Sequence, residues 1–414
     1  MKSCKRENMS AIVNETLSIK FPQDKFADFY LYDLTLTEGI SDICRAEAVV
    51  LSDKPHSLEQ LNEALDANVT VTVSQRLSDG KAKRTRFFHG IVTAVSHNGV
   101  FYSSDKTDCF SYRLTIESEL AVLRQVVRKV AYNNKTPIDV ISELLSDYGI
   151  PPRFSEEYIS RKPFVSDCIY NQTTVSDYAF LKRLLTLYGL SYTVKHPKVS
   201  NGGLGRAELY FSAGEHYPER SDVVYSDGRA PMAIEEFDFR SSDEPRNLWR
   251  LNEWAMTRGQ GVDGVMLTET YPNSNVGSEK WKAGLTDAGN RRRIYTEHFH
   301  NYVRGVDKAK VDADVDLILQ AQYRAFQIIK DVWTGTADNL LFMPCKRFRI
   351  KHFYGRRDSS AISGMVVKSV LHCHAKLPSS LAAVADWQAD KEIVEVSFSA
   401  MNCADETRYC SLGE

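Results

Sequence analysis

Alternating apolar and polar residues mark much of the first 120 residues of the chain. The stretches 17–21 and 69–73 alternate in this way, and a longer apolar run lies at 87–97. A period of two is typical of strands that bury one face. Between the first two stretches, Ser57 begins a short helix with the spacing of a capping box. The apolar positions of that helix are Leu58, Leu61 and Leu65. Short strands interrupted by one helix predict a small β-barrel or sandwich.

Two amphipathic helices with clear start and stop signals are predicted in the middle of the chain. Thr136 can cap the first helix, Pro137 suits its first position, and Gly149 ends it. The second helix starts near Ser176 and closes at Gly189. The apolar stripes are Ile138, Ile141, Leu144, Leu145 and Tyr148 in the first helix, and Phe180, Leu181, Leu184, Leu185 and Tyr188 in the second. Alternating strands follow, so this region is predicted to be a small α+β subdomain.

Long loops and one long helix precede the last strands. Stretches rich in Gly, Asn and Asp, such as 271–290, predict surface loops. A helix is predicted over 308–332, and its buried face comprises Ile318, Ala321, Ala325, Ile328 and Ile329. Strands then resume at 346–355, 364–374 and 392–401.

Two stretches far apart in the chain repeat one short pattern. Residues 87–99, FFHGIVTAVSHNG, and residues 363–375, SGMVVKSVLHCHA, each carry Val-x-x-Val-x-His shortly after a glycine. The matched pairs are Val92 with Val367, Val95 with Val370, and His97 with His372. A duplicated barrel would leave such a trace in its equivalent strands. We therefore predict two barrels that superpose with these pairs aligned.

The predicted fold class is mainly β with an α+β insert: two similar small β-barrels plus a middle α+β subdomain. We assign residues 15–120 to the first β-barrel and 121–235 to the α+β subdomain. Residues 236–400 form the second β-barrel region, with its long loops and the helix near 308–332. Residues 401–414 carry no periodic signal and are predicted to be a disordered tail.

Composition and charge argue against several classes of protein. The 414 residues are 43% hydrophobic and 26% charged, as in an ordinary globular protein. The net charge of −2 argues against a dedicated nucleic-acid binder, which needs excess positive charge along the phosphates. The sequence shows no apolar stretch of signal-peptide length and no window near the ~20 apolar residues of a membrane helix. We therefore expect synthesis in the cytoplasm and no membrane-spanning segment.

The eight cysteines are scattered, and none forms a C-x-x-C pair. In a reducing compartment such cysteines are expected to be free thiols, mostly buried. They are Cys4, Cys44, Cys109, Cys168, Cys345, Cys373, Cys403 and Cys410.

Histidines beside the second repeat raise the question of a metal site. In a strand, His372 and His374 would point to one side and Cys373 to the other. Two histidines make only half of a tetrahedral site, so further ligands would be needed. We favour a barrel strand without a metal. The other histidines considered are His97 and His352, as further ligands, and the alternating pair His298 and His300.

Signatures of catalysis are equally weak. The sequence has no G-x-S-x-G elbow, no H-E-x-x-H and no phosphate-binding loop. The acidic pairs Glu235-Glu236 and Asp243-Glu244 could in principle serve a glycosidase. Pairs so close in sequence are usually solvated loop charge. We predict no catalytic, cofactor-binding or metal-binding residue, no cofactor, and no enzyme.

The order of these motifs resembles the N-terminal module of VgrG, the spike protein family of type VI secretion. The matched segments are 88–92, Tyr112–Thr115, Tyr148–Ile150, Phe180–Tyr192 and Ser369–His372. The resemblance covers roughly residues 15–400. The hub of contractile phage tails uses the same fold. The family continues into a further barrel and a β-helical needle, whose repeats do not occur before Glu414, so puncturing is not expected of these residues.

The resemblance implies a structural role and a set of partners. Three chains would assemble around one axis, so that six barrels form a ring able to dock on a hexameric, Hcp-like tube. An effector cargo would be a further partner, and the protein would leave the cytoplasm as part of the spike. Without a needle the homotrimer is expected to be weak. The alternatives are a tail hub or baseplate protein of a contractile phage and, in another class, a hydrolase or metal-dependent enzyme with an unrecognised site.

Overall fold

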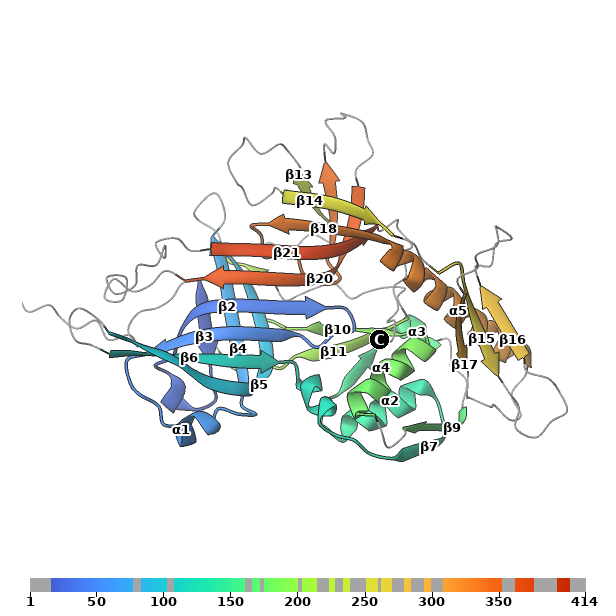
Figure 1. The fold of residues 1–414 in the computed structure, drawn as a ribbon, viewed down its shortest axis with the longest axis horizontal. Coiled ribbons are helices and arrows are strands. Elements are labelled where there is room, and N and C mark those ends of the chain that lie inside the picture. The colour runs from blue at the N-terminus through green and yellow to red at the C-terminus, as the bar shows by residue number, and fades with distance from the viewer. Residues whose placement is uncertain are drawn as a thin grey trace, which may run out of the picture.

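The computed structural model shows a large β-sheet flanked by helices and smaller sheets (Figure 1). It describes residues 16–76, 83–102, 108–160, 166–171, 175–199, 203–213, 223–227, 234–238, 251–259, 262–269, 279–283, 294–298, 308–351, 362–375 and 393–402. The fold is mainly β, as predicted, and its large sheet has 13 strands within the described residues. Among the helices of the described ranges, none has the length and apolarity needed to cross a membrane.

Six strands of the N-terminal region form the first half of the large sheet, in the order β1-β4-β5-β6-β3-β2. They are β1 (Leu17–Lys20), β2 (Tyr30–Gly39), β3 (Arg45–Ser52), β4 (Asn68–Arg76), β5 (Lys83–Tyr102) and β6 (Asp108–Glu117). The two ends of this run, β1 and β2, lie against each other. The six strands therefore curl around a core of side chains that alternate along each strand. Two 3-10 helices flank the run, η2 (Asp24–Phe26) and η3 (Glu119–Arg124).

The short helix α1 (Leu58–Asn62) begins with the predicted capping box at Ser57 but is shorter than its leucine spacing indicates. Only Leu61 is buried, whereas Leu58 is 72% and Leu65 is 39% exposed. The chain leaves the helix after one turn and reaches a left-handed conformation at Asp66, with φ 59°. Leu65, which has the predicted helical spacing, therefore lies beyond the end of the helix.

The middle region contains both predicted helices, α2 (Pro137–Ser146) and α4 (Asp177–Leu187). Thr136 and Ser176 cap them through side-chain oxygens, and Gly149 and Gly189 follow them at φ +66° and +64°. Such φ values suit glycine, which has no Cβ to clash. Around the helices lie β7 (Val130–Lys135), β8 (Pro152–Phe154), α3 (Glu156–Ser160), β9 (Ser166–Asn171), β10 (Ser191–Lys195) and β11 (Glu208–Ser212).

Six later strands form the second half of the large sheet, in the order β13-β19-β20-β21-β18-β14. They are β13 (Ile234–Asp238), β14 (Leu251–Arg258), β18 (Asp331–Ala337), β19 (Arg347–Lys351), β20 (Ile362–His374) and β21 (Ile393–Asn402). A small sheet of β15 (Gly264–Glu269), β16 (Glu279–Ala283) and β17 (Ile294–His298) lies beside α5 (Lys308–Lys330). On α5, Ile318, Ala321 and Ala325 are buried as predicted, and the side chains of Ile328 and Ile329 lie outside the described residues.

The two halves repeat one strand order, since β1, β4, β5, β6, β3 and β2 correspond to β13, β19, β20, β21, β18 and β14. One strand pair differs, because β1 is antiparallel to β4 whereas β13 is parallel to β19. The predicted repeat therefore lies on equivalent strands, β5 and β20. Each is flanked by the strand before it and the strand after it in the chain.

The register of the repeat is one residue away from the sequence match. A β-bulge falls three residues after Gly90 in β5, at Thr93, and three residues after Gly364 in β20, at Val367. Val92 therefore corresponds to Val366, and both are fully buried. The predicted alignment of Val92 with Val367 is wrong. The valine pattern begins one residue before the bulge in β5, at Val92, but begins at the bulge residue itself in β20, at Val367.

A second pair of bulges supports the same correspondence. The pairing of β2 with β3 shifts between Leu31 and Asp33, and that of β14 with β18 shifts between Leu251 and Glu253. Each shift follows a buried leucine in an outer strand of its half. Two independent irregularities thus coincide, which indicates duplication rather than a chance likeness of strand order.

The two halves are joined edge to edge by β2 and β20 (Figure 1). The strands are antiparallel and pair from Asp33 opposite His374 to Gly39 opposite Lys368. β12 (Val223–Tyr225), which lies in the segment assigned to the α+β subdomain, pairs with β5. β21 includes Met401 and Asn402 of the expected tail, and residues 403–414 lie outside the described residues.

Candidate assembly face

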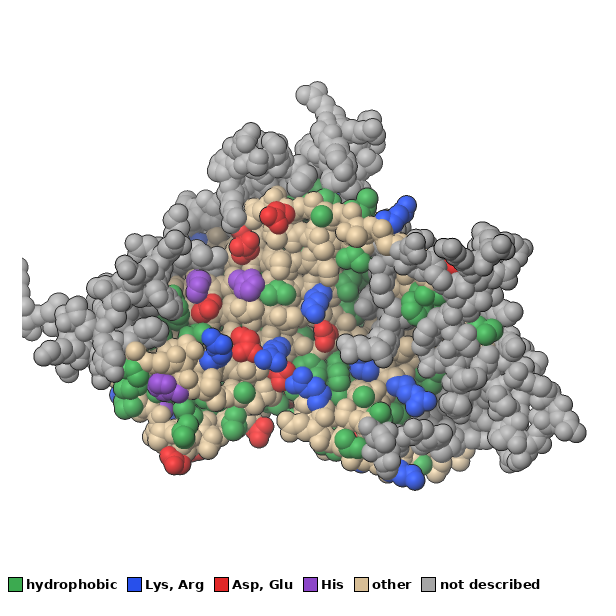
Figure 2. Space-filling view, in the orientation of Figure 1, with side chains coloured by type: hydrophobic (Ala, Val, Ile, Leu, Met, Phe, Trp, Pro, Cys, Tyr) green, Lys and Arg blue, Asp and Glu red, His purple; other side chains and the backbone are tan. Residues whose placement is uncertain are grey.

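Seven neighbouring strands present one continuous polar face, which we call the polar face. It runs across β6, β3, β2, β20, β21, β18 and β14, so it crosses the joint between the two halves. Most side chains on this side are partly or fully exposed, while those on the other side enter the core. Figure 2 shows acidic and basic side chains interspersed over this part of the surface. Registered neighbours on the face are Thr115, Glu47, Thr35, His372 and Glu395, and then Thr37, Val370, Ser397, Thr336 and Glu253.

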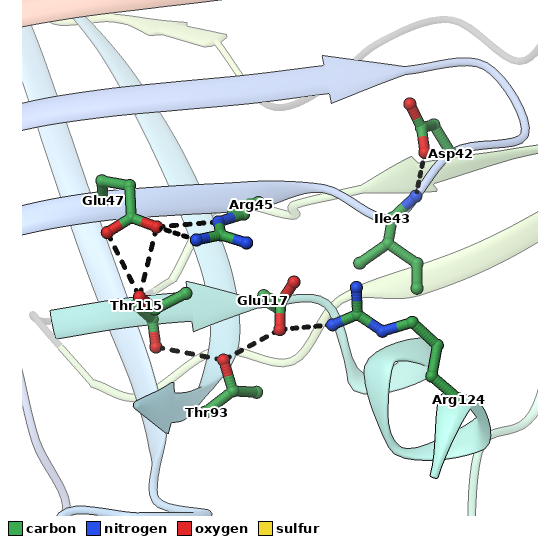
Figure 3. Close-up of polar contacts among 8 residues, drawn as sticks. All are labelled: Asp42, Ile43, Arg45, Glu47, Thr93, Thr115, Glu117 and Arg124. Carbon is green, nitrogen blue, oxygen red and sulfur yellow. Dashed lines mark hydrogen bonds and ion pairs between the residues drawn. The ribbon is translucent and has the colours of Figure 1, made fainter. Parts of the chain in front are cut away.

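Most charges on and around the polar face have a partner of opposite sign. The Arg45 guanidinium donates to Glu47 over 2.7 Å, and the Thr115 hydroxyl donates to the same carboxylate over 3.2 Å (Figure 3). At the end of β6, Glu117 accepts hydrogen bonds from Thr93 over 2.8 Å and from Arg124 over 2.6 Å (Figure 3). Such pairing produces no single-sign field of the kind that steers nucleic acid or a charged substrate.

A shallow hollow of about 390 Å³ lies on the polar face over β14, β18, β20 and β21. Half of its twelve lining residues are serine, threonine or glycine, and its ionisable lining residues are Glu253 and Lys368. Lys368 also lies 3.8 Å from the Asp42 carboxylate. A catalytic pocket typically combines enclosure with convergent titratable groups. This hollow has two ionisable groups and lies on an open sheet, so it lacks the enclosure of such a pocket.

The histidines considered as metal ligands do not converge. His372 Nδ1 lies 3.1 Å from the Thr35 hydroxyl, and His374 Nδ1 lies 3.4 Å from an Asp33 carboxylate oxygen. Cys373 points into the core on the other side, where burial raises the pKa of its thiol. His97 packs edge-on against Tyr112, and three strands separate its strand β5 from β20. His300, His352 and the side chain of His298 lie outside the described residues.

The described acidic pair, Glu235 and Glu236, does not form a catalytic site either. Glu235 is buried and lies 3.6 Å from the Lys346 ammonium. Glu236, the next residue of β13, is partly exposed and lies 3.7 Å from Arg349. Consecutive strand residues point to opposite faces, so the two carboxylates diverge. Asp243 and Glu244 lie outside the described residues.

One buried cluster was not predicted from the sequence. Glu38, Cys44 and His196 are all buried and bring possible ligand atoms within 4.8 Å of one another. The Arg86 guanidinium forms an ion pair with Glu38 at the same place, and both side chains are 1% exposed. A fixed cation beside the carboxylate opposes the binding of a second cation.

The hydrogen bonds of His196 also argue against a metal. The backbone N–H of His89 donates to His196 Nδ1 over 3.0 Å, so in neutral His196 the ring proton is on Nε2. Nε2 faces a Glu38 oxygen at 3.8 Å, where its proton suits the carboxylate. A ligand nitrogen needs a lone pair rather than a proton, so we interpret the cluster as a structural polar network. His196 is far from Glu38 and Cys44 in the sequence, and no local spacing indicated the cluster.

We expect the purified protein to contain far less than one equivalent of zinc per chain, because both candidate histidine groups are engaged otherwise. Elemental analysis after exhaustive dialysis measures this directly. The His196→Asn variant is the matched comparison. One equivalent of zinc that disappears in His196→Asn would overturn our interpretation of the cluster.

Comparisons with known proteins agree with the fold. The E. coli c3393 protein matches with a TM-score of 0.55 at 13% identity, over 95% of this chain and 79% of that one. That protein is a component of the type VI secretion system and is described as similar in structure to the bacteriophage T4 tail proteins gp27 and gp5. A tail protein from Neisseria meningitidis matches with a TM-score of 0.55 at 11% identity, over 95% and 98%. The Francisella PdpA–VgrG complex contains a chain that matches with a TM-score of 0.54 at 10% identity.

The last match covers 95% of this chain but 58% of the longer Francisella chain. At these identities the matches show a common fold. No curated protein sequence matches the chain. The family model of the phage tail baseplate hub (GPD) matches residues 37–373, which is well over half of the sequence and spans both halves of the large sheet. The chain therefore belongs to the phage tail baseplate hub family, whose members are structural proteins of the tail.

Proposed function

We propose that the chain is the base of a type VI secretion spike, in which three copies form a ring of six similar barrel units. The observation that carries this proposal is the repeated strand order, because it places two equivalent units in one chain. Three such chains present six units, and six units match a hexameric tube. The protein acts in this proposal through protein–protein contacts rather than through catalysis.

The polar face is the surface we assign to the inside of the ring. It runs without interruption across the joint between the halves. Its exposed positions are largely threonine, serine and paired charges, such as Arg45 with Glu47. A surface of this kind stays hydrated and offers no large apolar patch to hold a passing protein. These properties suit the wall of a channel that is continuous with a tube.

The tube and an effector are the partners proposed beyond the trimer. The tube partner, a hexameric Hcp-like protein, follows from matching six units to six subunits. A cargo partner is supported by the Francisella structure, in which a VgrG chain is in complex with PdpA. The protein would then assemble in the cytoplasm and leave the cell with the spike.

A tail hub of a contractile phage is the second candidate, and the Neisseria tail protein favours it. The two candidates share the ring but differ in the tube. Binding of the purified chain to a type VI tube protein, compared with a phage tube protein in the same pull-down assay, distinguishes them. Specific binding to the phage protein alone would overturn the secretion assignment and leave the hub.

We expect the purified chain to show a monomer–trimer equilibrium that depends on concentration. The ring model requires three copies, and its contacts are expected to bury well over ~2,000 Å², as obligate assemblies do. Light scattering across a dilution series measures the mass of each species, with 46.9 kDa for the monomer. A dimer that persists at all concentrations would contradict the hub proposal, because two-fold closure cannot build a ring of six units.

A further inference from the structure

The strand β14 and part of the strand β5 each have an edge with no described strand partner. β14 pairs with β18 on one side, and no described strand pairs with its other side. In β5, pairing with β4 ends at Ile91, and from Thr93 to Tyr102 only β6 is paired among the described strands. An edge with unpaired backbone groups is a template for another strand.

The chain already fills the equivalent edge once. β5 corresponds to β20, and β14 corresponds to β2, by strand order and by the positions of their bulges. β2 pairs with one edge of β20, and this pairing is the joint between the two halves. The equivalent part of the β5 edge, from Thr93 to Tyr102, is the one that has no described partner. The same joint would form if β14 of one copy paired with β5 of a second copy.

Side chains at the two open edges show what the missing partner would cover. In the internal joint, Leu36 of β2 lies opposite Leu371 of β20, and the two side chains are 1% and 0% exposed. The bulges align Leu36 with Met256 of β14 and Leu371 with His97 of β5. Met256 is 63% exposed and His97 is exposed as well. Core-facing positions are thus buried where the joint is made and exposed where it is not.

We propose that β14 of each copy adds as an antiparallel strand to β5 of the next copy, with Met256 opposite His97 and Thr257 opposite Ser96. The register follows from the internal joint, in which Thr37 lies opposite Val370 and Leu36 opposite Leu371. The joint is head-to-tail, so each copy uses its β14 edge once and its β5 edge once. Closure after three copies rests on the proposed function, whereas the strand pairing itself does not.

The pairing would continue the polar face from chain to chain. Thr257 and Ser96 are exposed and fall on the polar side of their strands. Ser96 lies opposite Arg113, which is exposed on the same side. On β14, every second residue points to the same side, so Thr257 follows Glu253 and Ala255. Met256 and His97 fall on the core side. Each new joint would therefore bury the core-side pair and extend the channel wall without a break.

A disulfide between Ser96→Cys and Thr257→Cys tests the register. Directly opposed residues of antiparallel strands lie about 4.5–5.5 Å apart at Cα, within the range that a disulfide spans. Oxidation of the double variant at high protein concentration is expected to give a covalent closed trimer. Mixing the two single variants is expected to give a covalent dimer, which shows that the link joins different copies.

The matched control pairs Ser96→Cys with Glu253→Cys, whose position on β14 is displaced by four residues, about 13 Å along the strand. It is expected to give at least tenfold less cross-linked product. The unsubstituted chain measures the background from its eight native cysteines. Equal cross-linking in the control would overturn the proposed register.

The outcomes separate this pairing from the proposed ring. A trimer in light scattering without the Ser96–Thr257 cross-link would overturn the strand pairing and leave the trimer standing. A cross-linked ladder that extends beyond three chains would support the pairing and overturn the three-fold hub. Neither trimer nor cross-link at high concentration would overturn both.

Met256→Lys provides a second test that does not depend on cysteine chemistry. A lysine charge at a position buried by the joint is expected to weaken association by at least tenfold in the dilution series. Leu58→Lys is the control, since Leu58 is 72% exposed and lies on α1 rather than on either edge strand. Unchanged association in Met256→Lys, or an equal loss in Leu58→Lys, would contradict the proposed joint.

Discussion

Replacing Glu38 with alanine is expected to lower the free energy of unfolding by about 3–5 kcal/mol, the usual effect of removing one partner of a buried ion pair. Glu38 of β2 pairs with Arg86 of β5, and each side chain is 1% exposed. Without the carboxylate, the guanidinium would be left with its charge uncompensated in the core. Urea denaturation, at a concentration where the chain is monomeric, measures the change in stability.

An exposed ion pair on the same sheet is the control for this measurement. Arg45 and Glu47 are 53% and 34% exposed and lie on the polar face. Solvent screens such a pair, so Glu47→Ala is expected to cost less than about 1 kcal/mol. If Glu38→Ala lowered the free energy of unfolding no more than Glu47→Ala did, Glu38 and Arg86 would not form the buried ion pair seen in the structure.

Replacing both Glu38 and Arg86 with methionine distinguishes two causes of the stability loss in Glu38→Ala. One is the lost attraction between the two charges, and the other is the uncompensated charge of Arg86 in the core. The double variant is expected to be more stable than Glu38→Ala, since apolar residues of similar volume can substitute for a buried pair at little cost. A double variant less stable than Glu38→Ala would show that the pair contributes more than mutual neutralisation. His196, which follows β10 and faces the same carboxylate, would account for such a loss, because the network connects the middle region to the first barrel.

The local signals of the sequence predicted the helices of the middle region well, because capping and periodicity act within a few residues. Thr136 accepts a hydrogen bond from the Asp139 backbone N–H, and Gly149 adopts the left-handed conformation after α2. The signals for α1 were equally local but misled in part, since an apolar period does not show where a helix ends. Leu65 continues the period and lies outside the helix.

The partners of strands could not be predicted in the same way, because pairing across a sheet joins residues that are distant in the sequence. The pairing of β2 with β20 is an example, and so is the approach of His196 to Glu38. The repeat was visible in the sequence, but its register was not. A bulge moves every later side chain to the opposite face of the strand. Val366 and Val367 are the same residue type, so the sequence does not show that the bulge falls at Val367.

Leu184→Ala is expected to lower the free energy of unfolding by about 2–5 kcal/mol, the range for emptying a packed leucine position. Leu184 lies on the stripe of α4 and is 2% exposed within the main core cluster. The neighbouring helix residue Arg183 is exposed, so Arg183→Ala, expected to stay within about 0.5 kcal/mol, controls for changes in helix propensity. Both values come from urea denaturation of the monomer. A loss below about 0.5 kcal/mol for Leu184→Ala would show that α4 does not bury this face, and that the middle region is not packed as a core.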